Sequence, residues 1–553
     1  MSLFAVALGS CALFVLGYAV YGRLLAQWFD LQPRRATPAC KLNDGVDYVP
    51  AKAPLLLGQH FSAIAAAGPI VGPILGALWF GWLPALIWIV VGAICFGAVH
   101  DFAALVSSVR HQAKSIVELV HEHLGPQAHW LFMGFVWLSL VYVIVAFTDL
   151  TSASFVEPAL GGGVAASSSL YLIAAVAMGV CLYKLRMPLG MATAIFLPIV
   201  GLIIWFGQSI PLALPADGPV RPQVMWNGII LLYCCIASIA PLWLLLQPRG
   251  YLGGFFLYVT LAAGVIGLLL GGDRIQYPAF LGWTSQKGFP LFPMLFVTVA
   301  CGACSGFHGI VSSGTTSKQI ANEMDCRLVG YGGMLLEGLV AVIALATVML
   351  LAPGDAAVQQ SPDRIYANGL SHFVERFGID PGFARSFALL AFATFIYDTL
   401  DVATRLGRYT FQELTGWKGR WGGLGATLAT LALPAISVSW TVKDAAGKIV
   451  PAWKVFWTLF GTSNQLLAAL TLVTITVWLK RTKRPWLVSA IPAAFMLVMT
   501  LWSLLLTIWP WLSGMASGQA TFDWIALIAL ILLLLAAAIL AAGFGALRRP
   551  RPS

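Results

Sequence analysis

Hydrophobic runs of about 20 residues recur along the whole chain, and short polar segments separate them. A run of this length lets an α-helix cross the hydrocarbon core of a bilayer. A transmembrane β-barrel is not favoured, because its strands would alternate apolar and polar residues in short segments. We therefore predict an all-α polytopic membrane protein with about fifteen transmembrane helices, near residues 3–22, 56–80, 82–108, 129–149, 168–184, 190–207, 226–246, 252–271, 290–313, 328–352, 383–400, 420–440, 454–479, 485–511 and 523–546.

Positive charge gathers in alternate connections between these spans. The strongest groups are Lys480–Arg484 and Arg548–Arg551, with two predicted spans between them. Positively charged loops stay in the cytoplasm, so we expect the N-terminus outside and the C-terminus inside. The same pattern assigns Arg249 to a cytoplasmic loop, and Asp149 and residues 353–382 to outer loops.

The composition agrees with this membrane class. The chain is 59% hydrophobic and 10% charged, whereas soluble domains carry about 25% charged residues. The net charge of +10 lies mostly in the short loops, so it does not indicate nucleic-acid binding. Nine cysteines are scattered, and we interpret the pair Cys301 and Cys304 as packing residues of an apolar helix. We expect no metal and no cofactor.

Two stretches resemble each other and lie seven predicted spans apart. Phe61–Gly68 and Phe307–Gly314 share Phe, Ile and Gly, with two small residues before the glycine. An odd offset makes them cross the membrane in opposite directions, as an inverted repeat requires. Chance similarity within a small membrane alphabet is the alternative.

We expect both of these stretches to be interrupted helices. The first continues into Gly68–Pro73, whose two Gly-Pro steps remove backbone donors. The second ends in Ser312–Thr316, whose hydroxyl groups can bond to a freed backbone. Paired broken helices near the midplane usually mark a transporter's binding site. The alternative is close helix packing through small residues.

Ionisable residues inside the spans are functional candidates, because burying them in lipid is costly. Glu337 lies well within its span and could carry a coupling proton, or be a hydrogen-bonded structural residue. Asp398 and Asp401 share a helix face, and Arg405 follows one turn later. These three residues fit an ion-paired cytoplasmic helix end or, alternatively, an intracellular gate or ion site.

Histidines and amides supply further candidates. His60 and His308 lie within the repeated stretches and could titrate, donate to a substrate carboxylate or be structural. His100–Asp101 lies near the inner end of its span and fits a helix-end pair. Asn464–Gln465 can bond across helices or line a site.

Eight short motifs occur along the chain in a characteristic order: Asn43–Pro50, Gln59–Ile64, Gly68–Pro73, Ala98–Phe102, Ala300–His308, Ser312–Thr316, Asn322–Glu323 and Phe460–Gln465. Together they resemble the carbon starvation protein A (CstA) family of transporters, over residues 10–480. The resemblance implies an inner-membrane transporter of bacteria or archaea, for peptides or, in some members, for pyruvate with protons. It also implies the amino acid–polyamine–organocation superfamily. The larger members carry a longer insertion after the span at 328–352, which leaves the substrate open.

We therefore predict secondary active uptake of a peptide or a small carboxylate such as pyruvate, coupled to protons, in the carbon-starvation response. A sodium-coupled amino-acid-type symporter and a passive channel are the alternatives. No HExxH, GxSxG or phosphate-loop motif is present, which argues against an enzyme and against ATP hydrolysis. We expect a transporter core over 1–480, followed by a pair of helices and a basic tail over 481–553; five-plus-five and seven-plus-seven repeat arrangements both remain open.

The predicted site combines two groups of residues. Helix N-termini at the breaks would attract a substrate carboxylate. The predicted substrate-binding residues are His60, Ser62, Gly68, Pro69, Ser305, His308, Ser312, Ser313, Thr315, Asn464 and Gln465. The predicted coupling or gating residues are Glu337, Asp398, Asp401, Arg405 and Asp101.

Overall fold

The structure is a computed structural model that describes residues 2–44, 48–65, 67–215, 217–241, 243–439, 451–517 and 523–548. These residues are mostly helical. The described part of the chain contains isolated β-bridges but no β-strand. Residues 45–47 of the 43–50 motif lie outside the described residues, as does the predicted basic tail beyond Arg548.

Thirteen helical segments of the described chain are long and apolar enough to cross a membrane. This confirms the predicted all-α polytopic membrane class. The segments are α1–α2 (Leu3–Trp28, with a π-helical turn at Gly17–Tyr21), α6–α7 (Trp82–Arg110), α9 (Pro126–Phe155), α10 (Gly161–Tyr183), α11 (Leu189–Gly207), α12 (Pro222–Ile239), α13 (Leu246–Leu270), α16 with the turn before it (Arg327–Met349), α18 (Pro381–Thr415), α19 (Gly419–Ser439), α20 (Ala452–Arg481), α21 (Leu487–Ala516) and α22 (Trp524–Arg548).

The two remaining predicted spans are interrupted. The first consists of α4 (Ala53–Ile64) and α5 (Gly68–Phe80), which meet at 50°, and its break falls inside the Phe61–Gly68 stretch, as expected. The second consists of α14 (Leu291–Thr298) and α15 (Gly306–Gly314), with turn residues between them. This break precedes the Phe307–Gly314 stretch, which forms one continuous helix, so the prediction that this stretch is itself interrupted is wrong.

The two breaks pack directly against each other, and glycines permit this. A Cβ atom on Gly68 would collide with the Cys301 side chain, and one on Gly72 would lie 2.7 Å from the carbonyl oxygen of Thr298. Cys301 is thus buried at the crossing of the two broken segments, in agreement with its interpretation as a packing residue. The crossing places two helix interruptions at one point in the core.

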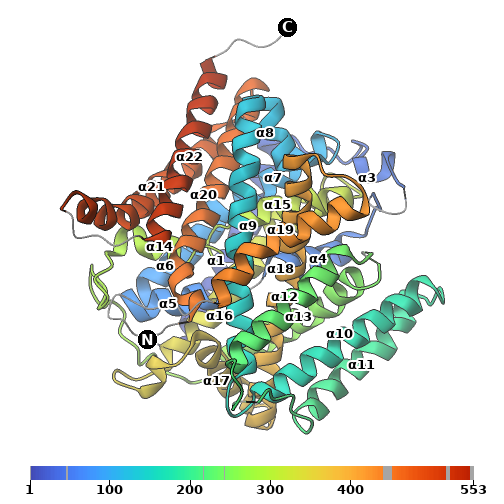
Figure 1. Ribbon diagram of the computed structural model, residues 1–553, viewed down its shortest axis with the longest axis vertical. Coiled ribbons are helices and arrows are strands. Elements are labelled where there is room, and N and C mark those ends of the chain that lie inside the picture. Colours follow the sequence, from blue (N-terminus) through green and yellow to red (C-terminus); the bar gives the residue numbers. More distant parts are fainter. Residues whose placement is uncertain are drawn as a thin grey trace.

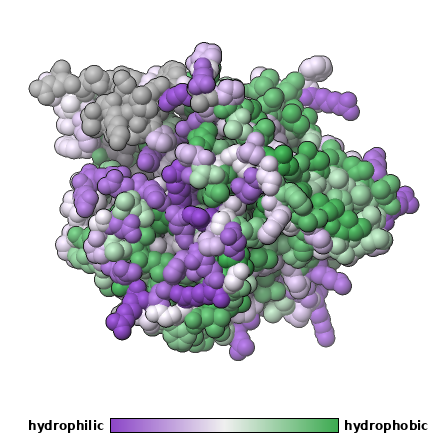
Figure 2. Space-filling view, turned by 90° about the horizontal axis from the view of Figure 1, so that it is seen from below, coloured by the Kyte–Doolittle hydropathy of each residue, from purple (hydrophilic) through white to green (hydrophobic). Residues whose placement is uncertain are grey.

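Helices α9, α18 and α20 form the enclosed centre of the bundle, while α10 and α11 project from its side (Figure 1). Viewed from below, the flank on which α10 and α11 lie is largely hydrophobic, and hydrophilic residues gather over the opposite half (Figure 2). Large apolar side chains such as Ile173 and Trp205 are exposed on this pair. A bilayer would cover them.

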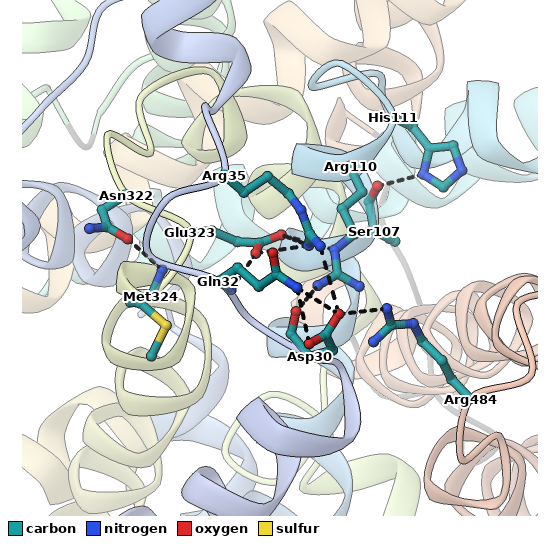
Figure 3. A network of polar contacts seen from close by, with 10 residues as sticks. All are labelled: Asp30, Gln32, Arg35, Ser107, Arg110, His111, Asn322, Glu323, Met324 and Arg484. Carbon is teal, nitrogen blue, oxygen red and sulfur yellow. Dashed lines mark hydrogen bonds and ion pairs between the residues drawn. The ribbon is translucent and has the colours of Figure 1, made fainter.

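One face of the molecule unites segments that the sequence predicts to be cytoplasmic (Figure 3). Glu323 is fully buried and accepts from Arg35 Nη1 at 2.8 Å and from Arg110 Nε at 2.9 Å. Arg484 donates to Asp30 at 3.0 Å. The loop after α2, the end of α7, the segment before α16 and the α20–α21 connection therefore share one face.

The opposite face unites segments predicted to lie outside. Ser2 forms an isolated bridge with Arg274, and Arg376 pairs with Asp273 at 2.7 Å. Arg364 pairs with Glu157 at 3.2 Å. The alternation of the loops between two faces agrees with the charge pattern, while the assignment of one face to the cytoplasm stays a prediction.

Two details of the loop assignment are wrong. Arg249 does not lie in a loop: it lies in the first turn of α13 and is 1% exposed. Asp149 is buried within α9, where it accepts from the Trp453 backbone at 2.9 Å. Distant partners satisfy these two side chains, so the helices continue through sequence that resembles connecting loops. Residues 353–382 lie largely between α16 and α18 and include the short helix α17 (Pro362–Glu375), so their placement outside stays a prediction.

Candidate functional site

The histidine–carboxylate cluster, formed by His100, Asp101, His308 and Glu337, lies inside the bundle. All four residues are fully buried. Asp101 lies between two imidazoles, with His100 Nδ1 and His308 Nδ1 each 2.8 Å from its carboxylate oxygens. The other ring nitrogen of His308, Nε2, is 3.1 Å from Glu337 Oε2. One histidine therefore bridges two buried carboxyl groups.

The hydrogen-bond contacts of Asp101 determine which nitrogen atoms of His100 and His308 carry hydrogens. An ionised Asp101 only accepts, so the Nδ1 atoms of His100 and His308 each carry a hydrogen. The remaining proton between His308 and Glu337 can lie on either partner, as an ion pair or as a neutral pair. A proton can thus enter or leave the His308–Glu337 pair without a change in the contacts of Asp101.

Local helix geometry brings these side chains together. A π-helical turn, Ala93–Gly97, immediately precedes the α7 segment that carries His100 and Asp101. Another, Arg327–Gly332, precedes the α16 segment that carries Glu337. Such turns are frequent at functional sites because they shift the register of a helix face. His308 lies in the first turn of α15, directly after the helix break.

The arginine cluster, formed by Arg249, Asp398, Asp401 and Tyr233, is the second buried group. Arg249 Nε donates to Asp398 Oδ1 at 2.7 Å, and its Nη1 pairs with Asp401 Oδ2. Tyr233 donates to Asp401 at 2.8 Å. The cluster links α12, α13 and α18 through one guanidinium that bridges two carboxylates.

Arg405 does not belong to this cluster, although the sequence placed it beside Asp401 as a possible ion-pair partner. Its Nη2 donates to the backbone carbonyls of Ala237 and Ala240, at 2.7 and 2.6 Å. The hypothesis of a helix end paired within α18 is therefore wrong. The side chain of Arg405 instead binds the carbonyl groups at the end of α12, which lack partners within their own helix.

A cavity of about 70 Å³ lies beside the arginine cluster. Arg249 and Asp398 line it, together with His60, Ser62 and Thr315, three of the predicted substrate-binding residues. One water needs about 10–15 Å³, so the cavity holds several waters or a small molecule. Ser62 donates to Asp398 Oδ2 at 2.9 Å, which fixes the wall that α4 contributes.

His60 connects this cavity with the histidine–carboxylate cluster. Its Nδ1 is 2.9 Å from the Thr316 hydroxyl, and its Nε2 is buried without a hydrogen-bond partner among the described residues. A Cβ on Gly333 of α16 would lie 3.1 Å from the His60 ring. Glu337 follows Gly333 by one turn on the same helix. His60 therefore lines the cavity and lies about one turn of α16 from Glu337 of the histidine–carboxylate cluster.

Three of the predicted substrate-binding residues hold the break before α15. Asn464 Oδ1 accepts from the Phe307 backbone at 2.9 Å, and its amide nitrogen is 3.0 Å from the Ser305 hydroxyl. Gln465 donates to the Phe296 carbonyl at 2.8 Å. These contacts satisfy backbone groups that the interruption of the helix would otherwise leave unpaired.

The other predicted substrate-binding residues do not line the 70 Å³ cavity. Gly68 and Pro69 begin α5 at the crossing of the two breaks. Ser313 Oγ accepts from the backbone of Ile116, the first residue of α8, at 3.0 Å. Ser312 is buried with no hydrogen-bond partner among the described residues.

Sequence reasoning missed two functional candidates, Arg249 and Tyr233. A signal for Arg249 was available, because only five residues separate the predicted spans 226–246 and 252–271, which is very short for a solvated loop that carries a charge. Tyr233 gave no signal, since tyrosine is common in apolar helices. Its partner Asp401 lies 168 residues away in the chain.

Known proteins support the resemblance drawn from the motifs. The family model of carbon starvation protein CstA matches residues 1–363 and 354–503. The peptide transporter CstA of Escherichia coli K12 is 31% identical over 90% of this chain and 80% of its own length. The pyruvate/proton symporter BtsT of the same strain is 30% identical over 90% of this chain and 81% of its own.

A solved structure of a manganese transporter mutant from Eremococcus coleocola covers 92% of this chain and 99% of its own, with a TM-score of 0.46 and 15% identity. This likeness is too distant to indicate a substrate. The family match spans most of the chain. The motif residues His100, Asp101 and His308 belong to the histidine–carboxylate cluster, and Ser62 of the 59–64 motif contacts the arginine cluster through Asp398. The chain belongs to the CstA family of carbon starvation proteins.

Proposed function

We propose that this protein is a proton-coupled secondary transporter of the bacterial or archaeal inner membrane that takes up small carboxylates of the pyruvate class or peptides. Its relatives are named as a peptide transporter and a pyruvate/proton symporter, which argues for transport and against an enzyme. The observation that carries the proposal is the contact between a substrate-sized cavity and a buried chain of titratable groups.

The cavity favours a small carboxylate in this conformation. Its volume of about 70 Å³ suits a molecule of a few heavy atoms better than a peptide. Arg249 supplies a permanent positive charge at its wall, and His60, Ser62 and Thr315 supply hydrogen-bonding groups. A substrate carboxylate could pair with Arg249 in competition with Asp398. Uptake of a peptide would require a wider conformation of the same site.

The histidine–carboxylate cluster supplies the proton site in this proposal. The His308–Glu337 pair can gain or lose one proton while Asp101 keeps both imidazole contacts. His60 lies between this pair and the cavity, so the charge of the pair can influence a bound anion. The coupling then arises because the protonated pair and the anionic substrate favour the same state.

Uptake into proteoliposomes tests the proposal. Labelled pyruvate and a labelled dipeptide are each offered with and without an inward proton gradient, and then with a sodium gradient alone. We expect one substrate to accumulate with the proton gradient only. Glu337→Gln should abolish this accumulation while substrate exchange without a gradient continues.

Asp363→Asn is the matched control. Asp363 is also a buried carboxyl, but it lies in α17 and contacts Ser154 at 3.2 Å, away from both clusters. This variant should accumulate substrate like the unmodified protein. Accumulation driven by the sodium gradient alone would show that sodium, not the proton, is the coupling ion. Flux that does not depend on any gradient would indicate a passive pathway.

A further inference from the structure

We infer that the corner between α7 and α8 is a binding site for one divalent transition-metal ion of the zinc class, held by His111, His123 and Glu122. The site lies outside the proposed transport pathway, on the face that carries Glu323. Helix α8 runs from Ile116 to Leu124, and His111 is the residue that ends α7. This inference departs from the expectation, drawn from the sequence, that the protein holds no metal.

The distances among the three donor atoms match those of a tetrahedral site. The Nε2 atoms of His111 and His123 are 3.2 Å apart, and His111 Nε2 is 3.7 Å from Glu122 Oε1. With metal–nitrogen bonds of about 2.0–2.1 Å, two ligand atoms of a tetrahedral ion lie about 3.3 Å apart. All three donor atoms lie within 4.8 Å of one another. Two imidazoles and a carboxylate therefore already surround one point.

The ring of His111 is oriented for metal binding. Its Nδ1 is 2.6 Å from the backbone carbonyl of Ser107, a contact visible beside the Glu323 network (Figure 3). A carbonyl only accepts, so Nδ1 carries the hydrogen, and in the neutral ring the lone pair of Nε2 points towards His123. Metal-bound histidines typically donate their other nitrogen to a carbonyl or carboxylate in this way.

Packing restricts the movement of both imidazoles. The His123 ring is buried and meets the His111 ring edge-on, with centroids 5.1 Å apart. The His111 ring packs against Trp478 with centroids 5.5 Å apart, which restricts its rotation. Glu122 is exposed, so an ion could enter from solvent and keep one water ligand.

One neighbouring charge opposes binding. Lys114 Nζ is 3.7 Å from Glu122 Oε2, whereas His111 Nε2 is 3.7 Å from the other oxygen, Oε1. The lysine competes with the ion for Glu122, although the two histidines remain available. Lys114→Gln should therefore tighten binding severalfold, an effect opposite in sign to that of the ligand variants.

A second group, which joins α8 to α9 and α18, is a weaker candidate and serves as a control. Glu118, His129 and Glu413 also lie close together, but they offer only one imidazole; Glu118 is half-buried and Glu413 is exposed. Imidazole is the better ligand for zinc-class ions, which favours the pair of histidines. Loss of binding on removal of His129 would place the ion in this second group.

A bound ion would fasten α8 to the end of α7. Ile116 at the start of α8 also donates to Ser313 of α15, so α8 contacts the helices that carry His100, Asp101 and His308. Occupancy of the site would restrain those helices at one face of the molecule. The inference does not depend on the transported substrate.

The test measures metal binding by the purified full-length protein. After removal of metals with a chelator, Zn²⁺ is titrated against a chromophoric competitor, and Co²⁺ serves as a spectroscopic probe of tetrahedral geometry. We expect one ion per chain and an intense cobalt band in the visible range. His111→Ala and His123→Ala should each weaken binding at least tenfold, whereas His129→Ala and His372→Ala should leave it unchanged.

Glu122→Gln keeps the test decisive if a buried-histidine variant fails to fold, because Glu122 is exposed. This variant should weaken zinc binding about tenfold, whereas Glu118→Gln on the same helix should not. Absence of tight binding in the unmodified protein would overturn the inference. So would binding that survives both His111→Ala and Glu122→Gln, or binding that His129→Ala removes.

Discussion

The histidine–carboxylate cluster and the arginine cluster have the same plan but different central residues. In each, one nitrogen-bearing side chain bridges two buried carboxyl groups: His308 joins Asp101 to Glu337, and Arg249 joins Asp398 to Asp401. Arginine stays charged at any physiological pH, whereas histidine titrates near neutrality in water. The arginine cluster is thus suited to constant charge and the histidine–carboxylate cluster to a variable one.

This difference divides the proposed tasks. The permanent ion pair can hold α13 and α18 together and offer Arg249 to an anionic substrate. The titratable pair can store the proton that drives uptake. Two sites with similar burial and similar carboxyl content would then differ in function because of one central side chain.

The largest expected effect comes from loss of the central arginine. Arg249→Met leaves two buried carboxylates without their cation, which should destabilise the protein by about 3–5 kcal/mol. Thermal unfolding and the yield of monodisperse protein measure this loss. Arg405→Met is the control, because Arg405 donates hydrogen bonds to the Ala237 and Ala240 carbonyl groups and forms no direct ion pair among the described residues; equal damage from both variants would argue against a special role of the Arg249 ion pairs.

The second effect concerns transport rather than folding. Glu337→Gln should lower proton-driven accumulation roughly 100-fold, the scale of a lost proton-transfer group. Thermal unfolding should change far less than for Arg249→Met, because a neutral amide can remain beside His308. Normal substrate accumulation by Glu337→Gln would indicate that the histidine–carboxylate cluster, like the arginine cluster, has a structural role only.

A smaller effect tests the link between the arginine cluster and the cavity. Ser62→Ala removes the donor to Asp398 and should cost about 1.5–3 kcal/mol, since the acceptor is charged. The apparent affinity for substrate should fall as well, because Ser62 lines the cavity. Ser139→Ala is the comparison, since its hydroxyl is buried without a partner among the described residues.

The smallest effect is expected at the exposed pair Asp30–Arg484, which serves as a solvated reference for both clusters. Its removal by Arg484→Ala should cost about 0.2–1 kcal/mol, and less in high salt. The hydrogen bond from Arg484 lowers the pKa of Asp30. Its stabilisation is therefore present above the unfolded carboxyl value near 4 and disappears as pH falls through the lower folded value. Unfolding measured against pH and salt checks this.

The sequence was sufficient for the spans, the broken helices and most of the ionisable candidates. Apolar runs and Gly-Pro steps are local signals, so α5 and the break before it follow from residues close together. Glu337 was conspicuous because a carboxyl is rare within an apolar span.

The pairing of these candidates was not predictable, because it depends on residues far apart. Arg249 lies 149 residues from Asp398, and His308 lies 207 from Asp101. A short polar break in the sequence resembled a loop at Arg249 and Asp149, since hydropathy does not reveal that a distant partner will satisfy a charge. For the same reason, Asn464 and Gln465 were predicted at the substrate site although they contact the backbone of a broken helix.

The contact between Asp30 and Arg484 has a consequence for the synthesis of the protein. These residues are 454 positions apart, and Arg110 and Glu323 join the same network at intermediate positions. A ribosome must translate a further 454 residues after Asp30 before Arg484 exists. The early helices must therefore enter the membrane while the network that fastens their face is incomplete, and chains truncated before residue 484 should be especially sensitive to membrane-associated proteases.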